Sequence, residues 1–200
     1  MQRFARGRIR LLALDLGRRS FVSTKIRDLV RDEGLGGMWK AAKSVLGVGD
    51  RAVAERYQTL AVYPQGSLGR AFHEHCMRSG FKLPGERGAA PEVLVFHDLG
   101  HVLAGYGTDP AGEVEMGGFE AGYMGEDGFS VTLLVLLLFH LGADVAPGTP
   151  PSRGAFDVDR FAAAYRRGRV MTVDLRAWDP WPFMDQPVAK VADYLSIPPR

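Results

Sequence analysis

The sequence predicts an all-α fold, a single compact multi-helix domain over residues 1–200. Helical hydrophobic periodicity recurs along the chain between short breaks rich in glycine and proline. Strand patterns are weak, because 59–64 and 170–175 are short and isolated. The chain has 200 residues, of which 46% are hydrophobic, so it is long enough to fill one core.

The first 20 residues predict a basic amphipathic helix. On a helical projection one side is apolar and the other is basic; the apolar side holds Phe4, Ile9, Leu11, Leu12 and Leu16, and the basic side Arg3, Arg6 and Arg10. Such a helix either lies on an anionic membrane surface or docks on its own domain with its arginines in solvent. Arginines inside the apolar run argue against a signal peptide.

Caps and breakers set the other helices. Ser67 and Gly80 bound one helix, and Pro91 opens another that ends at the glycines before Pro110. Thr108 or Asp109 caps the next helix, which carries the apolar run. That run is shorter than the about 20 residues needed to span a membrane. The expected helices lie over about 24–46, with an interruption at 33–39, and over 67–79, 91–104, 109–140 with a break near 125–128, 156–168 and 188–195.

Composition excludes several classes of function. The net charge is +2 and no basic run is interleaved with aromatics, so we expect no nucleic-acid partner. Cys76 is the single cysteine, which excludes a disulfide framework and a cysteine-based zinc site and fits a reducing compartment. We expect a cytoplasmic protein, and a peripheral position on the inner face of the cell membrane is the alternative left open.

Residues 97–113, "HDLGHVLAGYGTDPAGE", contain the candidate site. His97 and His101 lie one above the other on a helix, and with Asp98 they span an arc of about 100°. Two imidazoles at this spacing can hold one divalent ion, as in the HExxH helix of zinc enzymes. Asp98 is either a further ligand or a residue that orients a histidine ring.

Glu113 is too far along the chain to reach the histidines on an unbroken helix, since twelve residues span about 18 Å. Glycines and Pro110 between them require the chain to turn. We therefore expect a helical hairpin with the metal site at its closed end, and Gly105 on the histidine face, where it lets the two helices approach. A ligand set of His97, Asp98, His101 and Glu113 suits Zn²⁺, with Fe²⁺, Mn²⁺, Co²⁺ and Mg²⁺ as alternatives.

The pattern His-Asp-x-x-His-x11-Glu resembles the signature of the coenzyme Q (ubiquinone) biosynthesis protein four family. The segment "YPQGSLGRAF" and the tail "WDPWPFMDQPVAKVADYLSI" are also similar to that family, so the resemblance covers roughly residues 60–197. The first 50 residues match poorly. Residues 139–161 depart from the mitochondrial members, which indicates a bacterial homologue.

The resemblance implies an all-helical fold and a zinc ion held by His97, Asp98, His101 and Glu113. It also implies a metal-dependent lyase that decarboxylates a polyprenyl hydroxybenzoate at ring carbon one, with or without oxidation. The implied partners are a polyprenylated aromatic lipid, other ubiquinone-biosynthesis proteins and the membrane surface. The sequence leaves a homo-oligomer open as well. The alternative is a non-catalytic scaffold that binds the prenyl lipid. A zinc hydrolase with Asp98 as base is disfavoured by the spacing and the shorter acid.

Residues outside the motif give further expectations. Glu115, Glu120 and His140 are candidate proton donors, chosen by proximity in sequence, and His140 is otherwise expected in the core. Gly117, Gly118 and Gly122 either line a slot for a prenyl tail or allow close helix packing, the reading we favour. His73 and His75 face different directions on one helix, so they cannot chelate an ion together, and we expect both at the surface. Trp178 and Trp181 are expected in the core.

Overall fold

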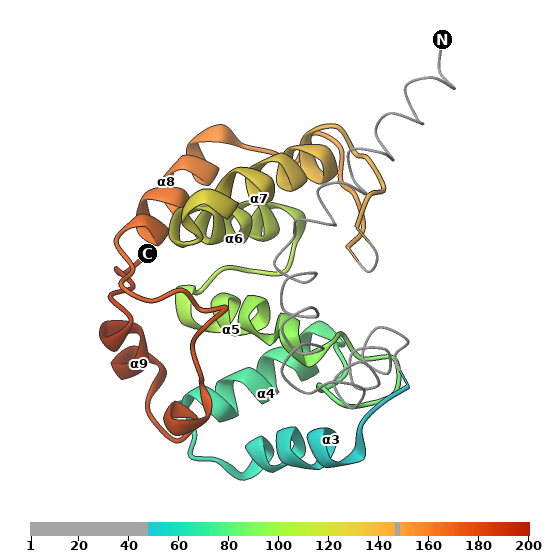
Figure 1. Cartoon of the computed structure of the whole chain (residues 1–200), viewed down its shortest axis with the longest axis vertical. Coiled ribbons are helices and arrows are strands. Elements are labelled where there is room, and N and C mark those ends of the chain that lie inside the picture. Colours follow the sequence, from blue (N-terminus) through green and yellow to red (C-terminus); the bar gives the residue numbers. More distant parts are fainter. Residues whose placement is uncertain (1–47, 147–148) are drawn as a thin grey trace.

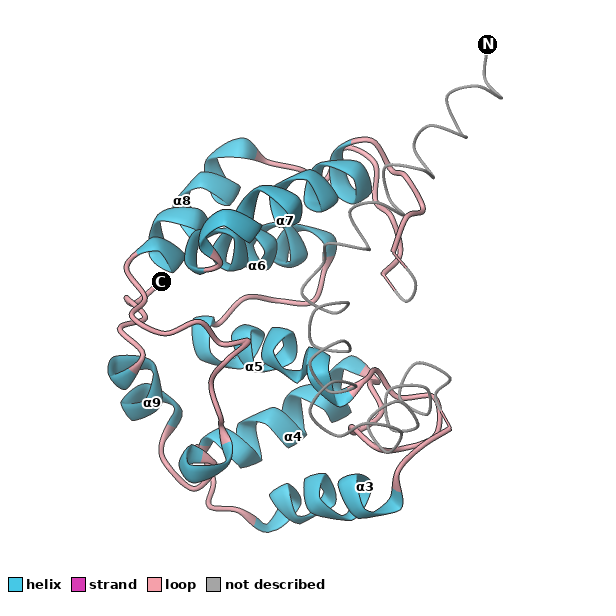
Figure 2. Ribbon diagram, viewed as in Figure 1, coloured by secondary structure: helices cyan, strands magenta, loops and turns pink. Residues whose placement is uncertain are grey.

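The helices are joined by turns and short 3₁₀ segments, as Figures 1 and 2 show for the computed structural model, which describes residues 48–146 and 149–200. No strand occurs in these two ranges, where Ser67 and Pro187 form one isolated bridge. The all-α prediction is therefore confirmed. The helices are α3 (Arg51–Gln58), α4 (Leu68–Ser79), α5 (Val95–Ala104), α6 (Pro110–Tyr123), α7 (Gly128–Val135), α8 (Val158–Arg169) and α9 (Val188–Tyr194).

Local capping accounts for the helix boundaries. The Ser67 hydroxyl accepts a hydrogen bond from the Arg70 amide at the start of α4, and Gly80 ends that helix with φ +69°. Asp109 caps α6 by accepting from the amides of residues 111 and 112, with Pro110 in the first position. Both caps are as predicted. Helix α3 was not predicted, and the helices expected over 1–20 and 24–46 lie outside the described residues.

The helix expected to carry the apolar run is interrupted near residues 125–128, as predicted. After α6 comes a 3₁₀ turn, Gly125–Asp127, and α7 then continues into a π-helix, Leu136–His140. None of the helices in 48–146 and 149–200 has the length and apolar character needed to cross a membrane. His140 is exposed at the end of the π-helix, with its ring 6.1 Å from that of Phe156. The expectation of a core histidine there is wrong, because the run ends where the chain leaves the core.

Helix α6 connects two clusters of buried apolar side chains. Met116 and Phe119 belong to a cluster shared with α4, α5 and α9, whereas Val114 and Ala121 belong to one shared with α7 and α8. Figure 1 shows α6 between α5 on one side and α7 and α8 on the other. A helix enclosed on several sides is apolar around most of its circumference, so the two acids it buries, Glu115 and Glu120, need partners.

The glycines of α6 serve close packing. A Cβ atom on Gly117 would lie 2.3 Å from a methyl carbon of Val135 in α7. On Gly118 it would lie 2.6 Å from the carbonyl oxygen of Phe161, and on Gly122 it would lie 2.4 Å from that of Tyr165, both in α8. Neighbouring helices therefore fill the space beside these three positions, which confirms the packing interpretation and leaves no slot along them.

Replacing Gly122 by alanine is expected to destabilise the fold. The added methyl group would meet three backbone atoms of α8, which cannot move aside as a flexible side chain can. Overpacking of this kind costs about 1–3 kcal/mol or more. Urea denaturation measures the loss in free energy of unfolding. Ala163→Ser, an equally small change on the exposed side of α8, is the control, and equal stability of the two variants would contradict the packing described above.

Candidate metal centre

Three side chains from two helices converge at the candidate metal centre. Glu113 of α6 places one carboxylate oxygen 3.4 Å from Nε2 of His97 and the other 3.4 Å from Nε2 of His101. The two Nε2 atoms are 3.2 Å apart. One ligand atom from each of these residues lies within 4.8 Å of the other two, so the group could hold a metal ion.

The histidines share a face of α5 because they are four residues apart. Glu113 reaches them because residues 105–109 return the chain before α6 begins, and Glu113 stands in its first turn. The sequence prediction that the chain turns to deliver Glu113 to both histidines is confirmed by these distances. The hairpin arrangement of the two helices stays a prediction.

Gly105 contributes differently from what we expected. It ends α5 in the left-handed conformation, with φ +73°, and a Cβ there would meet nothing within 4 Å. Its role is therefore to permit the turn and not the approach of helices. Two other glycines sit in tight contacts. A Cβ on Gly112 would lie 2.1 Å from the carbonyl oxygen of Gly107 in the same turn, and a Cβ on Gly100 of α5 would overlap the side chain of Met116 in α6.

The remaining ring nitrogens of both histidines are occupied by acceptors. Nδ1 of His97 is 2.8 Å from a carboxylate oxygen of Glu120, two turns beyond Glu113 on α6. Nδ1 of His101 is 3.2 Å from the carbonyl oxygen of Tyr106. A carbonyl oxygen and a carboxylate only accept, so each Nδ1 carries a hydrogen, and in the neutral ring each Nε2 presents its lone pair toward Glu113. Metal-binding histidines are oriented in this way in proteins.

The charges around the site favour a cation. Partial burial lowers the pKa of His97, but the carboxylates of Glu120 and Glu113 outweigh it and raise that pKa well above its usual value. Burial raises the pKa of Glu113, but contacts with the imidazoles of His101 and His97 outweigh it and bring that pKa to about 2. Without a metal, a proton on His97 supplies positive charge, and a divalent ion would supply it in the same place.

Asp98 lies outside the group of three. Its carboxylate is 3.9 Å from Nε2 of His75, a residue of α4 whose ring stacks on that of His101 with centroids 5.6 Å apart. His75 is buried, so the expectation that it lies at the surface is wrong. The sequence spacing could have predicted this burial, because His75 shares one face of α4 with three buried apolar residues, Leu68, Phe72 and Cys76. Asp98 thus neighbours a ring that supports a candidate ligand.

The three candidate proton donors have different surroundings. Glu120 contacts the metal group through His97, whereas Glu115 is paired with Arg160 and Arg200. His140 is the exposed residue beside Phe156. The position of Glu120 could have been inferred, because seven residues after Glu113 is two turns along the same face. Trp178 and Trp181 pack against the core as expected, partly buried.

Comparison with known proteins adds no family assignment. No model of a protein family matches the chain, and no curated protein is significantly similar to it. The resemblance to the ubiquinone-biosynthesis family therefore rests on the motifs alone.

Removing a ligand is expected to abolish metal binding. His101→Ala and Glu113→Ala each delete one of the converging groups, so zinc affinity should fall by more than about 100-fold, beyond the effect typical of residues outside the coordination sphere. Equilibrium dialysis with metal analysis measures it. His73→Ala is the control, because His73 lies on α4 outside the group. Asp98→Asn tests whether Asp98 is a ligand. If this variant loses as much zinc affinity as Glu113→Ala does, Asp98 binds the metal directly.

Glu120→Gln is expected to weaken zinc binding by about 10–100-fold while leaving all three ligands in place. The amide keeps the shape of the side chain but removes the charge that accepts the hydrogen of His97 Nδ1. Titration against a zinc-competing chromophore measures the affinity. Glu126→Gln, on the exposed turn after α6, is the matched control, and equal affinities for the two variants would rule out this role for Glu120.

Proposed function

We propose that this protein is a zinc-dependent enzyme of ubiquinone biosynthesis that decarboxylates a polyprenyl hydroxybenzoate at ring carbon one. The observation that carries the proposal is the convergence of two imidazoles and one carboxylate from His97, His101 and Glu113. Three protein ligands are typical of catalytic zinc sites, which keep a further position for water or substrate. The substrate and the pathway come from the resemblance of the motif and of the segments at 63–72 and 178–197.

The proposed reaction breaks the bond between ring carbon one and the carboxyl carbon. Carbon dioxide leaves, the electron pair stays on the ring carbon, and a proton takes the place of the carboxyl group. A divalent ion bound at the site supplies a Lewis acid that stabilises negative charge on a substrate oxygen. Among the three candidate acids, Glu120 is the one that contacts the metal group, through His97. It accepts a hydrogen from His97 as a carboxylate, so it would have to take up a proton before it could deliver one to the ring carbon.

An oxidative version of the reaction would replace the carboxyl group by a hydroxyl group. One atom of molecular oxygen would enter the ring, the other would leave as water, and a two-electron reductant such as ascorbate or a nicotinamide would be needed. Zinc has no redox chemistry, so this version requires a redox-active metal such as iron. Two histidines and one carboxylate are also the ligand set of non-haem iron oxygenases. The donor set fits both metals, and metal analysis of the isolated protein distinguishes them.

A second candidate function is a lipid-binding scaffold without catalysis. Large apolar side chains are exposed on α7 and just after the π-helix that follows it, where Phe129 is 73% and Leu141 is 53% exposed. Such side chains favour contact with a prenyl chain, a membrane surface or another ubiquinone-biosynthesis protein. In this alternative the metal ion would stabilise the α5–α6 junction and the lipid would be bound unchanged.

Purified protein loaded with Zn²⁺ or, without oxygen, with Fe²⁺ is expected to release labelled carbon dioxide from a carboxyl-labelled polyprenyl hydroxybenzoate in detergent micelles. Chelation should stop the release and added metal should restore it, because the Lewis acid is removed and returned. Glu113→Ala should be inactive and His73→Ala should match the wild type.

The iron-loaded protein is then assayed with oxygen and a two-electron reductant such as ascorbate, and its products are examined for ring hydroxylation. Metal binding and lipid binding without turnover under any of these conditions would favour the scaffold and contradict the enzymatic proposal.

A further inference from the structure

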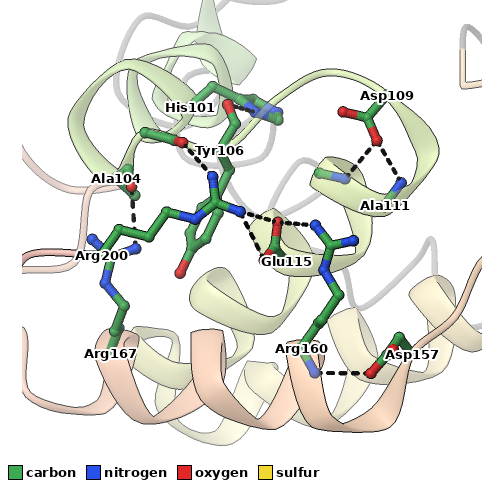
Figure 3. A network of polar contacts seen from close by, with 12 residues as sticks. His101, Ala104, Tyr106, Asp109, Ala111, Glu115, Asp157, Arg160, Arg167 and Arg200 are labelled. Atoms are coloured by element: carbon green, nitrogen blue, oxygen red, sulfur yellow. Dashed lines mark hydrogen bonds and ion pairs between the residues drawn. The ribbon is translucent and has the colours of Figure 1, made fainter.

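Two arginines from segments far apart in the sequence converge on the end of α5 and the loop that follows it. Arg167 of α8 donates to the carbonyl oxygen of Ala104 at 3.1 Å, and Arg200 donates to that of Gly105 at 3.0 Å. Arg160 of α8 joins them through Glu115. Figure 3 shows these groups around the loop and α6.

Two of these arginines also enclose Tyr106. The guanidinium carbon of Arg167 is 5.0 Å from the centre of the Tyr106 ring, and that of Arg200 is 5.2 Å from it. Contacts of this kind are attractive because the ring face is electron-rich. The Tyr106 ring is buried between these guanidinium groups and the core. The backbone of Tyr106 is therefore held in two ways, through its own ring and through the hydrogen bonds to the carbonyl oxygens of Ala104 and Gly105 just before it.

Glu115 fixes Arg200 in this position. Its two carboxylate oxygens accept from Nη2 of Arg200 at 3.0 and 2.9 Å, and one of them also accepts from Arg160 at 2.9 Å. Glu115 is buried, so its charge requires such partners. It is therefore committed to this network and is unsuited to serve as the proton donor considered from the sequence.

The network ends at a candidate metal ligand. The carbonyl oxygen of Tyr106 accepts the hydrogen of His101 Nδ1, which keeps the lone pair of Nε2 directed at the metal group. We propose that Arg167 and Arg200 are positioning residues that hold the Tyr106 carbonyl and thereby set the tautomer and orientation of His101 for metal binding. The inference rests on the metal site of the proposed function but not on the reaction that the site performs.

The test compares zinc affinity and the visible spectrum of the Co²⁺-loaded protein among single variants of the full chain. Arg200→Ala and Arg167→Ala are each expected to weaken zinc binding by roughly three- to tenfold, less than loss of a direct partner of a ligand. The Co²⁺ bands should also shift in both, because the ring of His101 is less fixed. Arg200→Lys should lie between wild type and alanine, since an ammonium cannot bond the carbonyl and the carboxylate as a planar fork does.

Arg160→Ala is the matched control, because it removes a bond to the same Glu115 without touching the loop. It should leave affinity within about twofold and the Co²⁺ spectrum unchanged, since it lies outside the shell around the ligands. Circular dichroism of the metal-free variants checks folding, and Arg200→Lys replaces the alanine variant if that one unfolds.

If the wild type binds metal and the zinc affinity and Co²⁺ spectrum are unchanged in both the Arg167 and the Arg200 variants, the inference is overturned. The metal site itself would then still stand. Wild type that binds no metal would instead overturn the site and this inference together.

Discussion

Three electron-pair donors face one another at the junction of α5 and α6, and the surrounding structure depends on how their mutual repulsion is relieved. Two Nε2 atoms lie 3.2 Å apart, and a carboxylate lies 3.4 Å from each. Because both Nδ1 atoms carry the hydrogens, neither Nε2 can donate to the other while the rings are neutral. A cation is needed between them, either a proton or a metal ion, and the neighbouring groups could support a metal ion.

Those neighbouring groups fix the ligands from three directions. Glu120 holds His97 from α6, the Tyr106 carbonyl holds His101 from the loop, and His75 stacks on the ring of His101 from α4. Each support comes from a different element, so the geometry of the site is a property of the whole helical assembly. The buried position of α6 between two apolar clusters keeps its acids in place, and the arginines of α8 and of the last residues hold the loop.

Local sequence predicted much of the fold. Ser67, Gly80 and Asp109 act as the caps they were expected to be, because capping depends on a few neighbouring backbone groups. Helix α3 was missed, since its eight residues carry a weak apolar pattern beside a glycine-rich segment. The buried position of His75 was readable from the spacing of its helix but was outweighed by its polarity, and the exposure of His140 was not readable, because an apolar run does not show where it leaves the core.

The sequence by itself determined the ligand types, the pairing of His97 with His101 on one helical face, and the need for a turn before Glu113. These follow from helical periodicity and from the backbone limits of glycine and proline, which act over a few residues. Only the tertiary structure decided that Asp98 points toward His75, that Glu120 supports His97, and that Arg167 and Arg200 enclose Tyr106. Contacts between segments up to 95 residues apart depend on how every helix packs around α6, which no local pattern specifies.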